Sequence, residues 1–164
     1  MSLILRILVF ICGGIIGIRS LRSFFGIARK PSYHQNFLDT ADIKLWDRYM
    51  PMGIFYGITT NPVLLERAGV SCDHKSLKEL ANIAIDKHKV SCFMLQTWGD
   101  TESLVSNGIQ LADISKRVVV KVPLTPSGIL AASALIERRI RVCMTACYSK
   151  DQVFTSAALG AGYQ

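Results

Sequence analysis

The first 36 residues contain no Asp or Glu, although they hold five of the 19 Lys and Arg residues. The rest of the chain carries the other 14 basic residues and all 12 acidic residues, so most of the formal charge of +7 belongs to the N-terminal segment. Without that segment the charge is that of an ordinary protein surface, which does not favour a nucleic-acid-binding protein. We therefore expect no nucleic acid among its partners.

A long apolar run is also absent. Residues 7–18 are apolar but interrupted by Gly13 and Gly14, and a membrane-spanning helix needs about 20 such residues. An apolar run followed by Arg and Ser without acids is typical of a targeting segment. We expect residues 1–36 to direct the chain to a plastid or mitochondrion, with a cytoplasmic location if the segment is not used. A tail without structure, a mispredicted start and an interfacial anchor helix are the alternatives.

Metal and phosphate signatures are missing as well. The five cysteines show no CxxC spacing and the three histidines no metal-ligand spacing, which favours reduced thiols, surface histidines and no bound metal. These residues are Cys12, Cys72, Cys92, Cys143, Cys147, His34, His74 and His88. No GxGxxG or GxxxxGK[ST] pattern follows the first apolar strand, and this weakens the Rossmann and P-loop folds as candidates.

From residue 37 onward, short apolar segments alternate with amphipathic ones. The pattern predicts strands over 37–38, 53–58, 90–96, 118–123 and 140–145. It predicts helices over 41–49, from Pro62 to Gly69, over 76–88, 101–114 and 126–138, and from Ser149 onward. Five strand and helix units with short connections indicate a parallel α/β domain over residues 37–164.

One strand contains a lysine where only apolar residues are expected. The stretch VVVKVP (118–123) is typical of a central strand buried on both faces, yet it holds Lys121. Burial disfavours the charged ammonium, so the pKa of Lys121 should fall and its amine should become nucleophilic toward a carbonyl. A strand-end lysine that reaches solvent, or pairs with Asp39, is the alternative.

Polar residues stand at the carboxyl ends of all five predicted strands, the edge where parallel α/β proteins build sites. They are Asp39, Thr59, Asn61, Gln96, Lys121 and Thr145. Taken singly, Asp39 or Thr40 would be a helix cap, and Thr59 and Asn61 have the same default role. Tyr148 follows the fifth strand and is a further candidate to face the site. Their convergence on one edge favours a catalytic site.

Four of these segments resemble the transaldolase family, in particular its small members and fructose-6-phosphate aldolase. They are FLDTAD (37–42), GITTNP (57–62), VVVKVPLTPSG (118–128) and VCMTACYS (142–149). The resemblance covers residues 37–164 and implies a (β/α)8 TIM barrel that acts as a class I, Schiff-base aldolase. It implies a sugar phosphate such as fructose 6-phosphate as the substrate, a place in carbohydrate and pentose phosphate metabolism, and no cofactor.

The resemblance also implies roles for the strand-end residues. Lys121 would form the Schiff base and Asp39 would be the acid/base carboxylate. Thr59 and Asn61 would contact the substrate. Gln96 stands where transaldolases usually have Glu and fructose-6-phosphate aldolase has Gln, which favours aldol cleavage, with a water held by Gln96 and Thr145.

Only five of the family's eight strands are predicted, so we expect a barrel truncated after about five βα units. The alternative is a catalytically inactive member that serves at most as a phosphosugar-binding or interaction module. A Schiff-base lyase of the deoxyribose-phosphate aldolase type is less favoured, because TTNP matches the transaldolase group. A full-length protein is expected to form a homo-oligomer.

Overall fold

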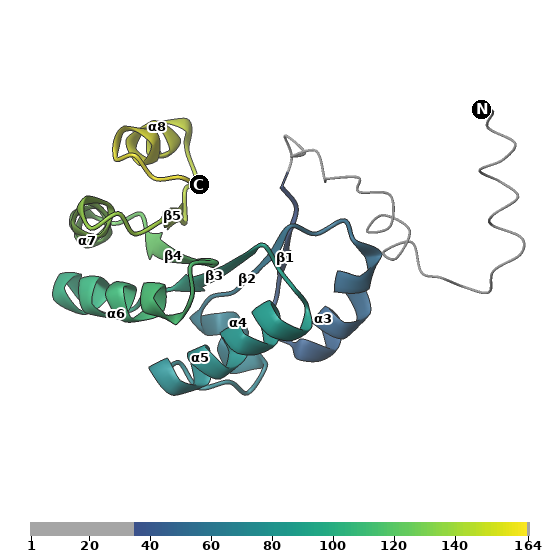
Figure 1. Ribbon diagram of the computed structural model, residues 1–164. Helices are drawn as coiled ribbons and strands as arrows, with labels where there is room; N and C mark the ends of the chain where they lie inside the picture. Colours follow the sequence, from purple (N-terminus) through teal and green to yellow (C-terminus); the bar gives the residue numbers. More distant parts are fainter. Residues whose placement is uncertain (1–34, 164) are drawn as a thin grey trace, which may run out of the picture. The chain divides into compact units, whose positions relative to one another are not determined.

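The computed structural model describes residues 35–163 (Figure 1). The predicted targeting segment lies outside the described residues except for Gln35 and Asn36. Within them, no helix is long and apolar enough to cross a bilayer.

Five parallel strands form one sheet in the order β1-β2-β3-β4-β5. They are β1 (Phe37–Asp39), β2 (Gly57–Thr59), β3 (Cys92–Gln96), β4 (Val118–Pro123) and β5 (Val142–Thr145). The α-helices are α3 (Ile43–Tyr49), α4 (Pro62–Arg67), α5 (His74–Asn82), α6 (Thr101–Ile114), α7 (Pro126–Glu137) and α8 (Lys150–Ala158). Sequential order with a helical connection after each strand confirms the predicted α/β class.

The register of the strands decides which side chains share a face. Gln96 pairs with Lys121, and Lys121 pairs with Cys143. Paired residues of a parallel sheet project to the same side, and successive residues project to opposite sides. Asp39 and Thr59 are likewise paired on β1 and β2. The face that carries Lys121 is called the inner face below.

The outer face packs against the helices and holds most of the core. Its strand residues include Ile58, Phe93, Leu95 and Val120, all without exposed area, and helices α3 to α7 follow one another along this side of the sheet (Figure 1). The helices contribute Trp46, Leu77, Leu111 and Leu135, which are buried in the same cluster.

The inner face carries a smaller cluster. Cys92, Met94, Val119 and Cys143 are buried there. Phe37, Tyr56 and Tyr163 are partly buried against them. Tyr163 forms a parallel bridge with Cys143, so the chain after α8 begins to pair along the free side of β5.

Most predicted helix starts are confirmed. Asn61, Thr125 and Ser149 cap α4, α7 and α8, and Ser149 forms a capping box with Gln152. Gly128 permits the close approach of α7 to β4, because a Cβ there would lie 1.8 Å from the Pro123 carbonyl oxygen. The glycine that ends VVVKVPLTPSG is therefore required by packing.

Other predictions were wrong in detail. Helix α5 begins at His74 with Asp73 as its cap, two residues before the predicted start. The second strand spans only 57–59, because the chain first forms the 3-10 turn η1 (Met50–Met52) and then turns at Gly53, whose φ is 72°. The π-helical segment η2 (Ile83–Lys87) replaces the last part of the predicted helix over 76–88.

His88 is buried rather than on the surface. Only 7% of it is exposed. Its ring packs edge-on against Trp46, and its Nε2 lies 3.4 Å from a carboxylate oxygen of Asp47. The sequence pattern around His88 gave no sign of this environment, because the contacts join the residue that follows η2 to two residues of α3.

Candidate active site

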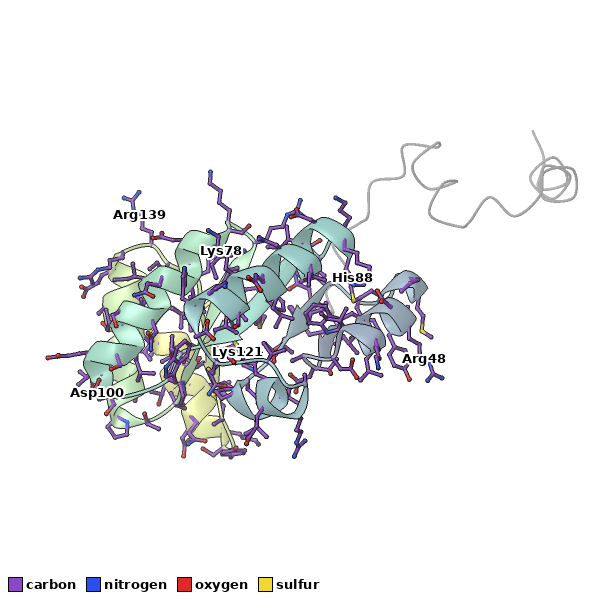
Figure 2. The ribbon with its side chains drawn as sticks, turned by 90° about the horizontal axis from the view of Figure 1, so that it is seen from below. Arg48, Lys78, His88, Asp100, Lys121 and Arg139 are labelled. Atoms are coloured by element: carbon purple, nitrogen blue, oxygen red, sulfur yellow. The ribbon has the colours of Figure 1, made fainter. Side chains whose placement is uncertain are left out.

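Lys121 is held inside the domain by hydrogen bonds to residues at the end of β2 and just after it. Only 8% of the residue is exposed. Its Nζ donates to Thr59 Oγ1 at 3.0 Å and to the backbone oxygen of Thr60 at 3.2 Å. The side chain therefore reaches from β4 past β3 to the end of β2. Figure 2 shows Lys121 in the interior, whereas Arg48 and Arg139 project from the margins.

The surroundings of Lys121 change its proton affinity. Burial lowers its pKa from the ordinary value of 10.5, while the negative charges of Asp39 and of an ionised Cys143 oppose that effect. Desolvation is the largest of these causes, as expected for an amine on an apolar strand. The direction agrees with the prediction from the sequence, and it raises the fraction of neutral amine at any given pH.

A cavity of about 460 Å³ opens beside this amine. Lys121, Thr59 and Thr145 all line it, so the structure brings together three of the predicted site residues. The other lining residues are Gln35, Phe37, Met94, Cys143, Met144, Ala146, Cys147 and Tyr163. The volume is within the range of small-molecule sites, and the lining combines one amine, three hydroxyls, two thiols and one amide with apolar side chains.

Asp39 is the last residue of β1 and does not cap a helix. Asp42 caps α3 instead, accepting from the Lys44 amide at 2.8 Å, and Thr40 Oγ1 accepts from the Asp42 amide at 3.1 Å. The prediction that Asp39 or Thr40 caps this helix was thus wrong. The exposed Asp39 lies beside Thr59 in register and acts electrostatically on Lys121, so its carboxylate is available for other chemistry.

Gln96 and Asn61 are less directly placed. Gln96 pairs with Lys121 in register and is half-buried, but it is not among the residues that line the cavity. Asn61 accepts from the Leu64 amide at 3.0 Å through Oδ1, which is the capping role that the sequence offered as its default. Its contact with a substrate stays a prediction.

Several cavity residues were missed by sequence reasoning. Cys143 lies two positions before Thr145 on β5, a spacing that places both on the inner face and could have been noticed. Ala146 has a φ of 63°, a left-handed conformation that is uncommon outside glycine and often marks functional sites. Tyr163 joins the cavity only through the return of the chain after α8. Tyr148, by contrast, is 90% exposed and does not line the cavity.

The side chains present suit covalent chemistry on a carbonyl compound. Within residues 35–163, no three His, Cys, Asp or Glu side chains gather as metal ligands would. The groups that converge on the cavity are instead an amine with a lowered pKa, hydroxyls, thiols and a nearby carboxylate. An amine of this kind can attack a ketone, and a carboxylate can move a proton at the adduct.

Comparison with known proteins agrees with this geometry. The family model described as Transaldolase/Fructose-6-phosphate aldolase matches residues 36–164. Curated relatives include probable transaldolases of Exiguobacterium sibiricum, 35% identical over 127 residues, and of Aquifex aeolicus, 34% identical over 129 residues. Each match covers 77% of this chain but only 57% and 56% of the respective relative. Thus the chain spans just over half the length of these relatives.

The match to the family model covers most of the chain, and its strand-end motifs surround the cavity just described. The five parallel strands are those expected of part of a TIM barrel. The chain therefore belongs to the transaldolase/fructose-6-phosphate aldolase family.

Proposed function

We propose that Lys121 forms a Schiff base with the ketone of a sugar phosphate, and that the chain carries this step for a class I aldolase or transaldolase. The observation that carries the proposal is the buried amine of Lys121, which lines a cavity and has a lowered pKa. A lysine in this state can be a nucleophile without a separate strong base. Fructose 6-phosphate is the proposed substrate.

The reaction begins when the neutral Lys121 amine attacks the C2 carbonyl. The adduct takes up a proton from solvent and loses water, which leaves a protonated imine. The imine draws the electron pair of the C3–C4 bond as that bond breaks. Asp39 accepts the proton of the C4 hydroxyl, and glyceraldehyde 3-phosphate leaves. The three-carbon enamine is then protonated and hydrolysed to dihydroxyacetone, or it adds to another aldehyde.

The remaining strand-end residues would select between these outcomes. We propose that Gln96 and Thr145 hold the water that hydrolyses the adduct, since neither an amide nor a hydroxyl titrates near neutral pH. Thr59 and Asn61 would contact the substrate hydroxyls. The glutamine at position 96 favours aldol cleavage over transfer, by resemblance to fructose-6-phosphate aldolase.

The wider role follows from the same assignment. The reaction belongs to carbohydrate metabolism and, for the transfer reaction, to the pentose phosphate pathway. We propose a homo-oligomer for a protein with the full length of the relatives. We also propose an organellar location if residues 1–36 act as a targeting segment, and a cytoplasmic one if they do not.

The test is reductive trapping. The chain is incubated with fructose 6-phosphate and sodium borohydride, digested and examined by mass spectrometry. We expect a reduced sugar adduct on Lys121, because borohydride converts the imine into a stable secondary amine. Lys121→Met should give none, whereas Lys116→Met, which removes an exposed lysine just before the same strand, should leave the adduct unchanged.

Two other results would reject the proposal. Random labelling of surface lysines without preference for Lys121 would show that the amine is not activated. Binding of fructose 6-phosphate with no trapped adduct would instead support the alternative of a phosphosugar-binding module. Neither result would change the family assignment.

A further inference from the structure

Two thiols lie in the wall of the Lys121 cavity and point to the same backbone atom. Cys143 Sγ is 3.7 Å from the carbonyl oxygen of Met144, and Cys147 Sγ is 3.8 Å from it. Because both distances end on one oxygen, the two sulfurs cannot be farther apart than the sum of these distances. Both residues line the cavity, and all four cysteines of the described region are free thiols.

The two thiols differ in access. Cys143 is buried on the inner face, directly beside Lys121 in the strand register. Cys147 is only half-buried and follows the turn at Ala146. A small oxidant arriving from solvent would therefore reach Cys147 more readily than Cys143, which is the second thiol of the pair.

We propose that Cys143 and Cys147 form a dithiol modification site that closes to an intramolecular disulfide in the presence of hydrogen peroxide, next to the amine of Lys121. In the first step an oxygen of the peroxide bonds to Cys147 Sγ, the O–O bond breaks, and water leaves with the thiol proton. Cys147 becomes a sulfenic acid.

In the second step Cys143 Sγ attacks Cys147 Sγ. The S–S bond forms, the S–O bond breaks, and the hydroxyl leaves with the proton of Cys143 as a second water. The two thiols together lose two electrons, and the peroxide is reduced to two waters. No further co-reactant is required.

The rate of this reaction depends on pH because the two thiols must lose protons to react. Burial raises the pKa of Cys143 to about 11 and also raises that of Cys147, while a protonated Lys121 opposes the effect on Cys143. The other titratable groups around this pair are Cys92, Tyr56 and Tyr163 on the inner face, with Asp39 acting on Lys121 and Arg141 on Cys92. Because the thiolate is the reacting form, the rate should increase as the pH rises from neutral into the alkaline range.

Closure should affect the chemistry at Lys121. A disulfide draws Cys147 toward the strand position beside the lysine and moves the turn through Thr145 and Ala146, both of which line the cavity. This consequence rests on the proposed function, whereas formation of the disulfide does not. We expect oxidation to lower the yield of the Lys121 adduct roughly tenfold, since small displacements of a reacting group have large effects on rate.

The experiment uses the complete chain treated with hydrogen peroxide, blocked with iodoacetamide and digested with trypsin. Cleavage after Arg141 and Lys150 releases one peptide that holds both cysteines, VCMTACYS followed by lysine. We expect this peptide to lose two hydrogens and to resist alkylation, and reduction with dithiothreitol to restore two alkylated thiols. The fraction closed at fixed time should rise with pH.

Two variants complete the design. Cys92→Ser removes a buried thiol of the same face that does not line the cavity, and should leave closure unchanged. Cys147→Ser should abolish it. A peptide that keeps two free thiols, carries only a sulfinic acid on Cys147, or is linked to Cys92 would overturn the proposal. If no Lys121 adduct forms before or after oxidation, the proposed function fails, and the peptide mass still decides the dithiol site.

Discussion

The two faces of the five-stranded sheet bury different kinds of side chain. The outer face packs large apolar side chains such as Phe93 and Leu95 against the helices. The inner face buries thiols, a thioether and Val119, with aromatic rings at its border, and leaves a cavity beside Lys121. The outer face resembles an ordinary protein core, whereas the inner face combines burial with reactive groups.

Strand β4 belongs to both faces. Val118, Val120 and Val122 pack outward into the main core, while Val119 lies in the inner cluster. Lys121 alternates with the outward valines and therefore faces inward. A buried charged group usually costs stability, so its presence on one face alone indicates that this face is not optimised for packing.

The largest effect on the free energy of unfolding is expected from two alanine substitutions in β3. The two residues are adjacent and face opposite sides of the sheet. Leu95→Ala should lower the free energy of unfolding by about 3 kcal/mol, because it leaves a void in a fully packed core. Met94→Ala should cost about half as much, since Met94 lines a cavity that already exists. Urea unfolding of both variants measures the difference. Equal losses would mean that the inner face is packed as tightly as the outer one.

The second prediction concerns Lys121 itself. Lys121→Met should raise the free energy of unfolding at neutral pH by about 1 kcal/mol, because it replaces a buried charge by an apolar side chain of similar length. The folded-state pKa of Lys121 lies below its unfolded value, so the unfolded chain binds more protons between the two. The stability of the native chain should rise with pH across that interval, and the advantage of Lys121→Met should shrink as the pH approaches 10.5.

The control for this experiment is Lys116→Met, which changes an exposed lysine and should show little difference at any pH. A variant at position 121 that is less stable than the native chain at every pH would contradict the prediction. It would show that the hydrogen bonds from Lys121 to Thr59 and Thr60 outweigh the desolvation of the amine.

An effect on stability of similar size is expected just after the end of β2. Asn61→Ala should lower the free energy of unfolding by about 1 kcal/mol, because the side chain caps α4. Asn61→Asp keeps the capping oxygen and should retain most of that stability. Comparing the two variants by urea unfolding and by borohydride trapping separates the cap from the proposed substrate contact. Equal destabilisation by Ala and Asp would rule out the capping oxygen as the stabilising group.

Local sequence patterns were sufficient to predict a strand or helix where the residues that determine its bounds lie close together in the chain. The strand over 118–123 and the helix over 101–114 have the predicted bounds, because apolar runs and capping residues act within a few positions. The burial of Lys121 was also expected from its apolar strand. The cap of α3 was assigned to the wrong residue, since Asp39, Thr40 and Asp42 are all suitable capping types and only the end of β1 selects among them.

The amino-acid sequence by itself determined the alternation of strands and helices, the parallel sheet and the convergence of polar residues on one edge, because each depends on short-range periodicity. Only the tertiary structure decided that Lys121 donates to Thr59, that Cys143 and Cys147 share the Met144 oxygen, and that Tyr163 reaches the cavity. These features depend on strand register and on the path of the turns. Both are set by the packing of the whole domain, which no short segment encodes.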